Sequence, residues 1–190
     1  MRLLLKGILS LTTLLGCVSV PITSIYKLMT LDVLGVVPSE VKVVTKTPKY
    51  FEVTEEDLKI TSSDNGGKAQ EIFPLVLDVA STPSEEVLED LRINERLYTL
   101  LLSDQDLSRL TASLNKIRTE RAEVQSDKEY SLGITIVNGC VRYEQPIKSA
   151  PVSLYLQPSE NIGMFKVLDD FNLASQDLSS YKNVQDWNDC

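Results

Sequence analysis

Most of this chain consists of short segments in which apolar and polar residues alternate, and this pattern constrains the fold more than any other feature. Alternation with a period of two is typical of a β-strand that buries one face. Residues that favour turns, chiefly Gly, Pro, Asn and Asp, separate the segments. The pattern predicts strands over residues 41–47, 57–63, 71–79, 96–102, 130–137, 140–143, 152–156 and 164–168. The chain is therefore predicted to be mainly β.

Three of these segments carry a more detailed prediction. The 41–47 strand places lysines among β-branched residues, so we expect one of its faces to lie in water. The Asp64-Asn65-Gly66-Gly67 sequence favours the positive φ values of a hairpin loop, which predicts that the strands on either side of it pair. Pro74 has no amide donor, so its strand is expected at a sheet edge or a bulge.

A single long helix is predicted over residues 104–125. Leu107, Leu110, Leu114 and Ile117 recur at intervals of three or four residues, which places them in one apolar stripe. Ser103 precedes this helix in an S-x-x-D capping box. We expect the stripe to pack against the sheet rather than to bind a partner. One or two further helical turns are expected over residues 84–91.

These elements predict an α+β fold: an antiparallel β-sandwich, immunoglobulin- or transthyretin-like, with one long helix on its flank. The sandwich is expected to form one domain over residues 40–190. A tether over residues 17–39 and a signal peptide over residues 1–16 would precede it. A hydrophobic fraction of 43% agrees with a globular chain.

The signal peptide is predicted from the first seventeen residues. Arg2 and Lys6 open the segment, and a short apolar run follows as far as Gly16 and Cys17. The run is about half the roughly 20 residues that a membrane-spanning helix needs. Cleavage is therefore expected between Gly16 and Cys17. A cleaved signal without lipid and a retained anchor are the alternatives.

The sequence Leu14-Leu15-Gly16-Cys17 resembles the bacterial lipobox. This resemblance implies that Cys17 becomes the new N-terminus and carries fatty acyl chains such as palmitate, which attach the protein to a membrane. Val18 follows the cysteine, and by analogy with enterobacterial sorting a residue other than Asp favours the outer membrane. The domain would then face the periplasm, with the inner membrane as the alternative.

The net charge indicates which partners are disfavoured, and the cysteine content predicts a disulfide. The formal net charge is −8, and signal cleavage would remove two more cations, so binding to nucleic acid or to anionic lipid head groups is disfavoured. Cys140 and Cys190 remain after Cys17 is acylated, and an even number of cysteines in an oxidising compartment predicts one disulfide. Two free thiols are the alternative.

Nothing in the sequence indicates an enzyme. The chain contains no histidine, which removes the commonest general base and the usual zinc ligand. Neither a nucleophile elbow nor a phosphate-binding glycine loop is present, and a catalytic carboxylate pair is only formally open. The stretches 62–66 and 186–189 are rich in side-chain oxygen atoms, but they are better explained as turns than as calcium loops. We predict no catalytic residue, cofactor or metal.

The lipobox, the hairpin at 57–79, the helix beginning at Ser103 and the strand at 152–156 together resemble a family of small, uncharacterised proteobacterial lipoproteins. More faintly, the architecture is similar to the type VI secretion lipoprotein, whose transthyretin-like sandwich docks an inner-membrane protein. The resemblance implies no known activity. We therefore predict a non-enzymatic, membrane-anchored lipoprotein whose periplasmic domain docks another component of the cell envelope.

Two other functions stay open. The domain could carry a lipid or another small apolar ligand between sheet and helix, or it could be a passive scaffold. For docking, the loop residues Asp64, Asn65 and Glu160 are the predicted contacts, because exposed loops and strand edges commonly bind partners. The aromatic residues could line a ligand groove, although core packing is the simpler explanation for them; they are Tyr50, Phe51, Tyr130, Tyr143, Tyr155, Phe165 and Trp187.

Overall fold

The computed structural model describes residues 21, 24, 27, 31–32, 35–55, 57–64, 69–123, 130–136, 139–142, 149–173 and 190. Gly16, Cys17, the hairpin residue Asn65 and the predicted end of the long helix at 124–125 lie outside these residues. For Asp64 only the backbone is described.

The fold is α+β, mainly β, with one long helix. A seven-stranded antiparallel sheet has the order β6-β3-β4-β5-β1-β8-β9, and a second sheet contains only β2 and β7. The large sheet contains β6 (Tyr130–Ile136), β3 (Leu58–Asp64), β4 (Ala69–Leu77), β5 (Glu95–Leu102), β1 (Lys42–Pro48), β8 (Pro151–Gln157) and β9 (Phe165–Asn172). The other elements are β2 (Phe51–Glu52), β7 (Cys140–Val141), the 3-10 helix η2 (Pro38–Glu40), α2 (Glu85–Glu89) and α3 (Asp104–Glu123).

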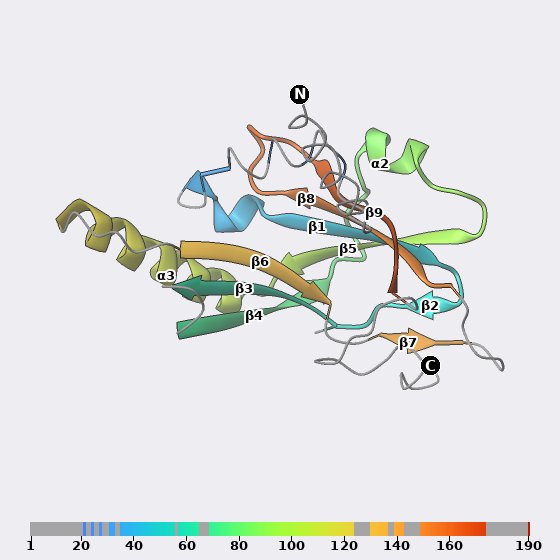
Figure 1. The fold of residues 1–190 in the computed structure, drawn as a ribbon, viewed down its shortest axis with the longest axis horizontal. Coiled ribbons are helices and arrows are strands. Elements are labelled where there is room, and N and C mark those ends of the chain that lie inside the picture. Colours follow the sequence, from blue (N-terminus) through green and yellow to red (C-terminus); the bar gives the residue numbers. More distant parts are fainter. Residues whose placement is uncertain are drawn as a thin grey trace, which may run out of the picture.

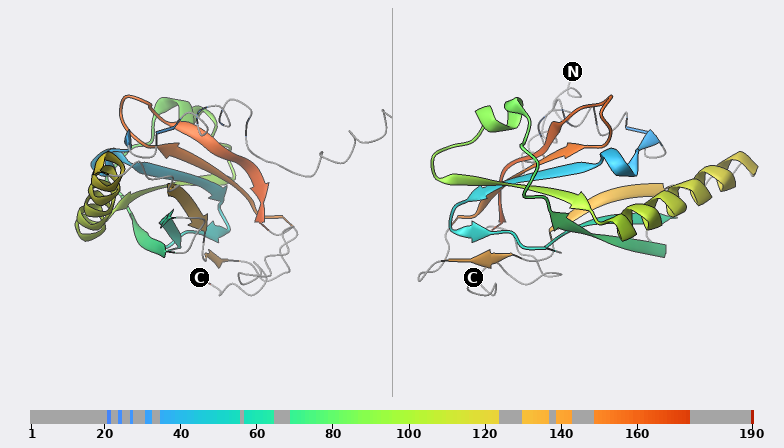
Figure 2. Two further views of the ribbon diagram at one scale, coloured as in Figure 1. Left: turned by 60° about the vertical axis from the view of Figure 1, so that its left-hand side comes forward. Right: turned by 180° about the vertical axis from the view of Figure 1, so that it is seen from behind.

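The large sheet curls, so that the half containing β3, β4 and β6 faces the half containing β1, β8 and β9 (Figures 1 and 2). This arrangement is sandwich-like although the strands belong to one continuous sheet. Helix α3 lies on the flank at one end of the curl, and the β2–β7 pair lies at the other end (Figure 1). The main hydrophobic core fills the interior, and its fully buried side chains include Val43, Leu58, Phe73, Leu75, Leu100, Leu110, Leu114 and Val152.

Helix α3 begins and packs as its sequence predicts. The Ser103 hydroxyl accepts a hydrogen bond from the Asp106 amide at 3.1 Å and donates one to the Asp106 carboxylate at 2.8 Å. Leu110 and Leu114 are fully buried in the core, and Ile117 is buried there as well. The apolar stripe is therefore part of the core.

The prediction that the 41–47 strand has one face in water is wrong. Strand β1 lies in the middle of the sheet between β5 and β8, and both of its faces are covered. Val43 packs in the main core, whereas Val44 packs in a second cluster with Val87 of α2. Lys46 is only 2% exposed. The alternating side chains of β1 therefore enter two different buried environments, and neither set lies in solvent.

The strand that contains Pro74 is not an edge of the sheet, contrary to the sequence prediction. Strand β4 pairs with both β3 and β5. The β4–β5 pairing begins at Leu75 opposite Leu102, so Pro74 lies one residue beyond the last pair with β5. The missing amide donor is tolerated because β5 ends at that point and α3 begins.

Several strand bounds differ from those predicted. The strand expected over 140–143 contains only Cys140–Val141, and it pairs with β2, which the alternation pattern does not reveal because it is two residues long. Strand β9 extends to Asn172, beyond the predicted end at 168. The predicted pairing across 64–67 is confirmed by the β3–β4 ladder, and the last two strands also pair, as β8 and β9.

The described residues before η2 pack against the domain. The Ser24 hydroxyl donates a hydrogen bond to the Lys166 carbonyl, and the Lys27 ammonium lies 5.0 Å from the centre of the Phe165 ring. Val36 is buried in the main core. The segment predicted as a tether therefore contributes residues to the folded domain.

Candidate apolar binding pocket

The interior of the curled sheet contains a pocket of about 440 Å³. Its volume lies within the range of roughly 300–1,000 Å³ that is usual for small-molecule sites. The lining residues are Leu31, Val36, Val41, Ile60, Leu110, Leu132, Gly133, Ile134, Leu154, Leu156, Pro158, Val167 and Leu168. The curl of the sheet thus leaves space that the core side chains do not fill.

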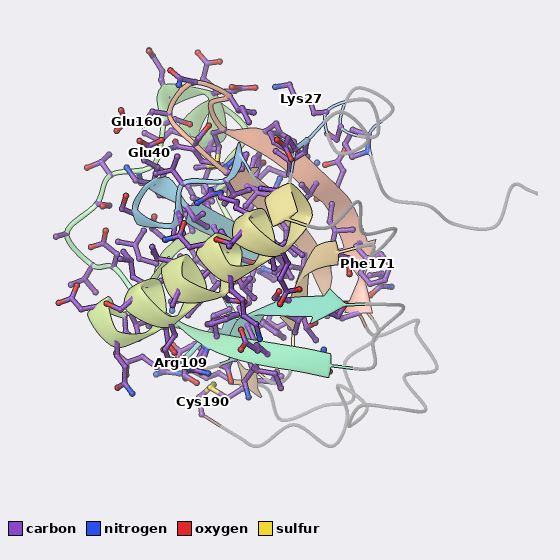
Figure 3. All side chains as sticks on the ribbon, turned by 90° about the vertical axis from the view of Figure 1, so that its left-hand side faces the viewer. Lys27, Glu40, Arg109, Glu160, Phe171 and Cys190 are labelled. Atoms are coloured by element: carbon purple, nitrogen blue, oxygen red, sulfur yellow. A yellow bond between two sulfur atoms is a disulfide. The ribbon has the colours of Figure 1, made fainter. Side chains whose placement is uncertain are left out.

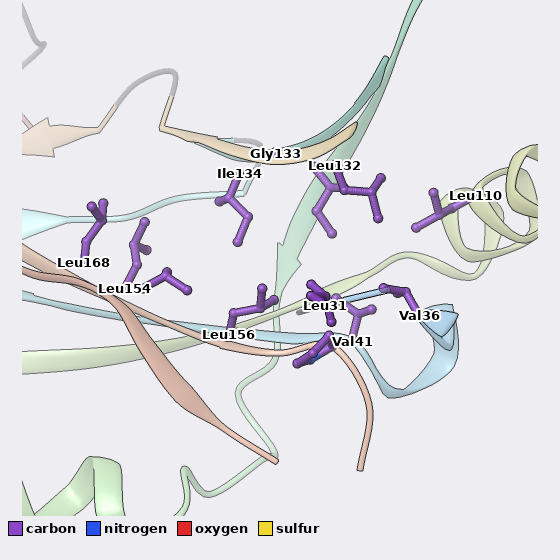
Figure 4. A pocket seen from close by; sticks show the side chains of 13 residues that line it. Leu31, Val36, Val41, Leu110, Leu132, Gly133, Ile134, Leu154, Leu156 and Leu168 are labelled. Atoms are coloured by element: carbon purple, nitrogen blue, oxygen red, sulfur yellow. The ribbon is translucent and has the colours of Figure 1, made fainter. Parts of the chain in front are cut away.

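The pocket lies between the two edge strands of the sheet (Figure 4). Leu132 and Ile134 of β6 point into it from one half of the curl, and Leu154 and Leu156 of β8 point into it from the other. Leu110 of α3 lies at one end. Because β6 and β9 do not pair with each other, the sheet is not a closed barrel, and the pocket is at its seam.

A bulge in β9 brings two consecutive side chains to the pocket. Leu154 pairs with Leu168, and the next residue of β8, Tyr155, pairs with Lys166, so Val167 is the extra residue. Successive residues of a regular strand point to opposite faces, but a bulge removes this alternation locally. Val167 and Leu168 can therefore both line the pocket.

The chemistry of the lining is uniform. Of the 13 residues that line the pocket, Gly133 has no side chain, and the side chains of all the others are aliphatic. None of them can donate or accept a proton, ligate a metal or hold a charge, and a cavity with such walls is a poor site for water. The pocket can therefore favour only the burial of apolar groups, and aliphatic chains match its walls best.

A second cluster lies on the opposite face of the sheet, under α2. The ammonium group of Lys46 is 3.0 Å from a carboxylate oxygen of Asp90, 3.6 Å from Glu95 and 3.7 Å from Asp170. Lys166 contacts the same Asp90 carboxylate at 2.8 Å. A buried ammonium needs such partners, since an unpaired charge in the interior is strongly unfavourable.

The cluster shifts the pKa values of its members. Burial by itself would raise the pKa of Asp90, but hydrogen bonds from Lys166, Tyr155 and Lys46 together hold it well below its usual value. Burial and the hydrogen bond to Asp90 raise the pKa of Tyr155, whose hydroxyl donates to that carboxylate. Asp90 is thus ionised and Tyr155 protonated at neutral pH, which suits a fixed structural contact rather than proton transfer.

This outer cluster attaches α2 to the sheet. Asp90 lies immediately after α2, and Val87 of that helix is fully buried against Val44 and Tyr155. The polar and apolar contacts therefore act on the same short helix.

The predicted disulfide pair comes together beside the β2–β7 sheet. Cys140 and Cys190 are bonded, with their Cα atoms 5.1 Å apart and a sequence separation of 50. Glu52 lies close to both sulfurs, but its carboxylate pairs with Arg96 and Arg142, each at 3.1 Å. Since the cysteines are oxidised, this group offers no thiolate to a metal ion.

The structure does not combine the predicted docking residues into one site. Glu160 lies between β8 and β9, where its amide donates to the Glu40 carboxylate at 2.8 Å, and the two side chains lie near each other (Figure 3). Asp64 ends β3, which is separated from β8 in the sheet by β4, β5 and β1. Asn65 is outside the described residues. The docking prediction stays untested.

Of the aromatic residues considered as groove-lining candidates, those whose side chains the structure describes, namely Tyr50, Phe51, Tyr155 and Phe165, do not line the pocket. Phe51, Tyr155 and Phe165 are buried in the two core clusters instead. The true lining was present in the sequence as the alternating apolar residues of β6 and β8. Alternation shows which side chains point inward, but it does not show whether they fill the space that they face.

No family model, curated protein or solved structure matches this chain. The lipoprotein resemblance therefore stays a prediction from the sequence. Within the described part of the chain, no helix is both long enough and apolar enough to cross a bilayer.

Proposed function

We propose that this protein is a membrane-anchored lipoprotein that binds one aliphatic lipid chain in the pocket of its curled sheet. The pocket of about 440 Å³ with wholly aliphatic walls is the observation that carries this proposal. Each methylene group removed from water contributes about 0.8 kcal/mol, so about eight of them contribute about 6 kcal/mol before the cost of association. This is sufficient for reversible binding without any polar contact.

The anchor makes such a pocket useful. A lipobox cysteine at position 17 would hold the domain at the surface of a membrane, where lipid is the most abundant aliphatic ligand. Attachment raises the local concentration of the pocket relative to that ligand. We infer that the protein carries or presents a lipid chain as an auxiliary of another envelope component, rather than modifying it chemically.

Binding is tested with the full chain carrying Cys17→Ser, which removes the lipid anchor. The probe is the methyl ester of a conjugated polyene fatty acid, because its fluorescence rises in an apolar environment. We expect saturable binding of one probe molecule per chain. Leu132→Trp in β6 and Val167→Trp in β9 fill the pocket from opposite sides and should each weaken binding at least about tenfold.

The matched control is Ile72→Trp, which adds the same side chain at a 45% exposed position of β4. It should bind the probe as the parent chain does. Circular dichroism and melting temperature establish that each variant is folded before its affinity is compared. Equal binding by all three variants, or no saturable binding by the parent chain, would show that the pocket is not a lipid site.

Docking of an envelope partner is the second candidate. Its support is the set of exposed apolar side chains on the β4–β5 connection around α2, where Val79 is 97% exposed and Ile93 is 86% exposed. Exposed apolar residues are common on protein surfaces, so this support is weaker than that of the pocket. In-cell crosslinking that captures one membrane protein, and loses it with Val79→Asp and Ile93→Asp, would favour docking.

A further inference from the structure

The two edge strands of the large sheet differ in how well they are protected against pairing with another chain. Strand β6 pairs with β3 over all seven of its residues in one regular register. Within the described part of the chain no strand pairs with the other side of β6, where the sheet ends (Figure 1). Alternate amide and carbonyl groups of an antiparallel edge strand point away from the sheet. This edge therefore presents a row of backbone donors and acceptors to a further strand.

Strand β9, the opposite edge, carries several features that hinder such pairing. Its register with β8 shifts twice, once at Val167. The second shift leaves Asp169 and Asp170 together opposite Ser153, and Asp170 has a φ of 44°, which is uncommon for a residue with a side chain. Lys166 adds a further charge to this edge. Bulges and charged side chains are common protections of edge strands, so β9 is a poor partner for another strand.

Strand β6 shows neither a register shift nor a charged residue. The whole chain has 27 acidic and 19 basic residues, so two copies repel each other on average. Beside β6, the outer face of β3 carries Lys59, Thr61 and Ser63, because Leu58 and Ile60 of that strand point into the core. None of these three outer residues is acidic. Two copies can therefore approach each other at the β6 edge without opposed carboxylates.

The sequence of β6 is complementary to itself about Gly133. In an antiparallel pair centred there, Leu132 of one copy lies opposite Ile134 of the other on the inner face. On the outer face Ser131 of one copy lies opposite Thr135 of the other. Aliphatic pairs and Ser–Thr pairs both stabilise neighbouring strands. Because the pairing is symmetric, each of these contacts forms twice.

A second copy would also extend a row of hydroxyl groups that exists within one copy. The Ser63 and Ser131 hydroxyl oxygens lie 2.7 Å apart on the outer face of β3 and β6. Thr135 of the second copy would come next in this row, followed by Lys59 of the same copy, which pairs with Thr135 in the β3–β6 ladder. The row thus contains one cation and no pair of like charges.

We propose that β6 of one copy pairs antiparallel with β6 of a second copy about a two-fold axis at Gly133, so that the two large sheets join edge to edge. A two-fold interface uses the same surface on both partners, which is the complementarity that β6 provides. A second copy is therefore the partner that this edge fits best. The inference goes beyond lipid binding and does not depend on it, since self-association requires no ligand.

The test measures the mass of the Cys17→Ser chain by sedimentation equilibrium over a series of concentrations. We expect a reversible equilibrium between monomer and dimer. Ser131→Lys combined with Thr135→Lys would place two lysines opposite each other at two points of the dimer, and should raise its Kd at least about tenfold. Lysine is well tolerated on edge strands, and circular dichroism and melting temperature establish that each variant is folded.

Ser131→Lys combined with Thr135→Glu tests the register of the pair. In the proposed register each lysine faces a glutamate of the other copy, so this variant should dimerise at least as tightly as the parent chain. The matched control is Ser108→Lys combined with Thr119→Lys, which adds two lysines at exposed positions of α3. It should leave the Kd of the dimer unchanged.

Three outcomes would overturn the inference. One is a parent chain that stays monomeric up to about 1 mM. Another is a dimer that the double-lysine variant of β6 forms as well as the parent chain does, because a different surface would then hold the two copies together. The third is a lysine–glutamate variant as weak as the double-lysine variant, which would exclude the pairing about Gly133. Binding of the polyene ester is measured separately, so none of these results would decide the lipid-binding function.

Discussion

The two faces of the large sheet are buried by different means. The inner face is covered by aliphatic side chains from both halves of the curl, and it encloses a pocket of about 440 Å³. The outer face beneath α2 is covered by an ion cluster around Lys46 and a small apolar group around Val87. Strand β1 contributes alternate residues to both faces.

The difference shows how one strand can support both a fixed contact and an adaptable one. Ion pairs and hydrogen bonds are directional, so the outer cluster holds α2 in one arrangement. Dispersion contacts are not directional, so the aliphatic side chains of the inner face can pack around unfilled space. This space costs free energy, and a bound aliphatic chain that fills it would remove that cost. Adaptability is therefore expected on the inner face and rigidity on the outer face.

The largest effect is expected from Lys46→Met, which removes the ammonium group at the centre of the outer cluster and keeps the apolar part of the side chain. Breaking a buried ion pair leaves uncompensated charge, so we expect a loss of about 3 kcal/mol in the free energy of unfolding. This is the low end of the usual range, since the Asp90 and Asp170 side chains are 34% and 35% exposed and can be hydrated. Urea unfolding measures the change.

Lys42→Met is the matched control, on the same strand and the same face but outside the cluster. It should change the free energy of unfolding by less than about 0.5 kcal/mol, as is usual for changes away from buried networks. An equal loss in both variants would show that the Lys46 cluster has no special role in stability.

Lowering the pH should weaken the ion cluster on the outer face and leave ligand binding on the inner face unchanged. In the folded protein the pKa values of Asp90 and Asp170 lie below the ordinary value of an aspartate, so the ionised forms of these two residues stabilise the fold. This contribution is complete above the unfolded-state pKa and is lost as the pH falls below it. Asp90→Asn should therefore flatten the decrease in melting temperature between about pH 5 and pH 2.

The inner face has no ionisable lining residue, so affinity for the neutral polyene ester should stay constant over the pH range in which the protein remains folded. A loss of ester binding that parallels the titration of Asp90 would contradict the independence of the two faces.

The smallest expected effects come from adding one methylene group to each face. Val44→Leu enlarges a fully packed outer position and should cost about 1–2 kcal/mol through overpacking. Val41→Leu makes the same change at a residue that lines the pocket, where space is present, and should alter stability by less than about 1 kcal/mol. Equal destabilisation of both variants, measured by urea unfolding, would mean that the pocket is closed in solution.

The local elements of this fold could be predicted because their signals are local. The capping box at Ser103 and the leucine spacing define α3, and period-two alternation defines the long strands. The order of the strands in the sheet could not be predicted in the same way, because β1 pairs with β5 and β8, which lie far along the chain. No residue within β1 indicates those partners, and for this reason Lys46 was predicted to be solvated.

The pocket and the ion cluster could not be predicted for a related reason. The partners of Lys46 come from three separate segments, at Asp90, Glu95 and Asp170. The pocket depends on the volume left between two halves of a sheet whose curl the sequence does not encode locally. By contrast, the pairing of Cys140 with Cys190 could be predicted, because assigning Cys17 to the predicted lipid anchor left only these two cysteines.

The central place of β1 has a consequence for the time course of folding. The β3–β4 and β8–β9 pairs join neighbouring segments and can form early, whereas Lys42 pairs with Gln157 across most of the chain. Contacts between such distant residues close large loops and slow the search. Until β8 has been synthesised, β1 keeps one unpaired edge that other chains can join. The earliest strand of the large sheet is therefore the one that waits longest for its second partner.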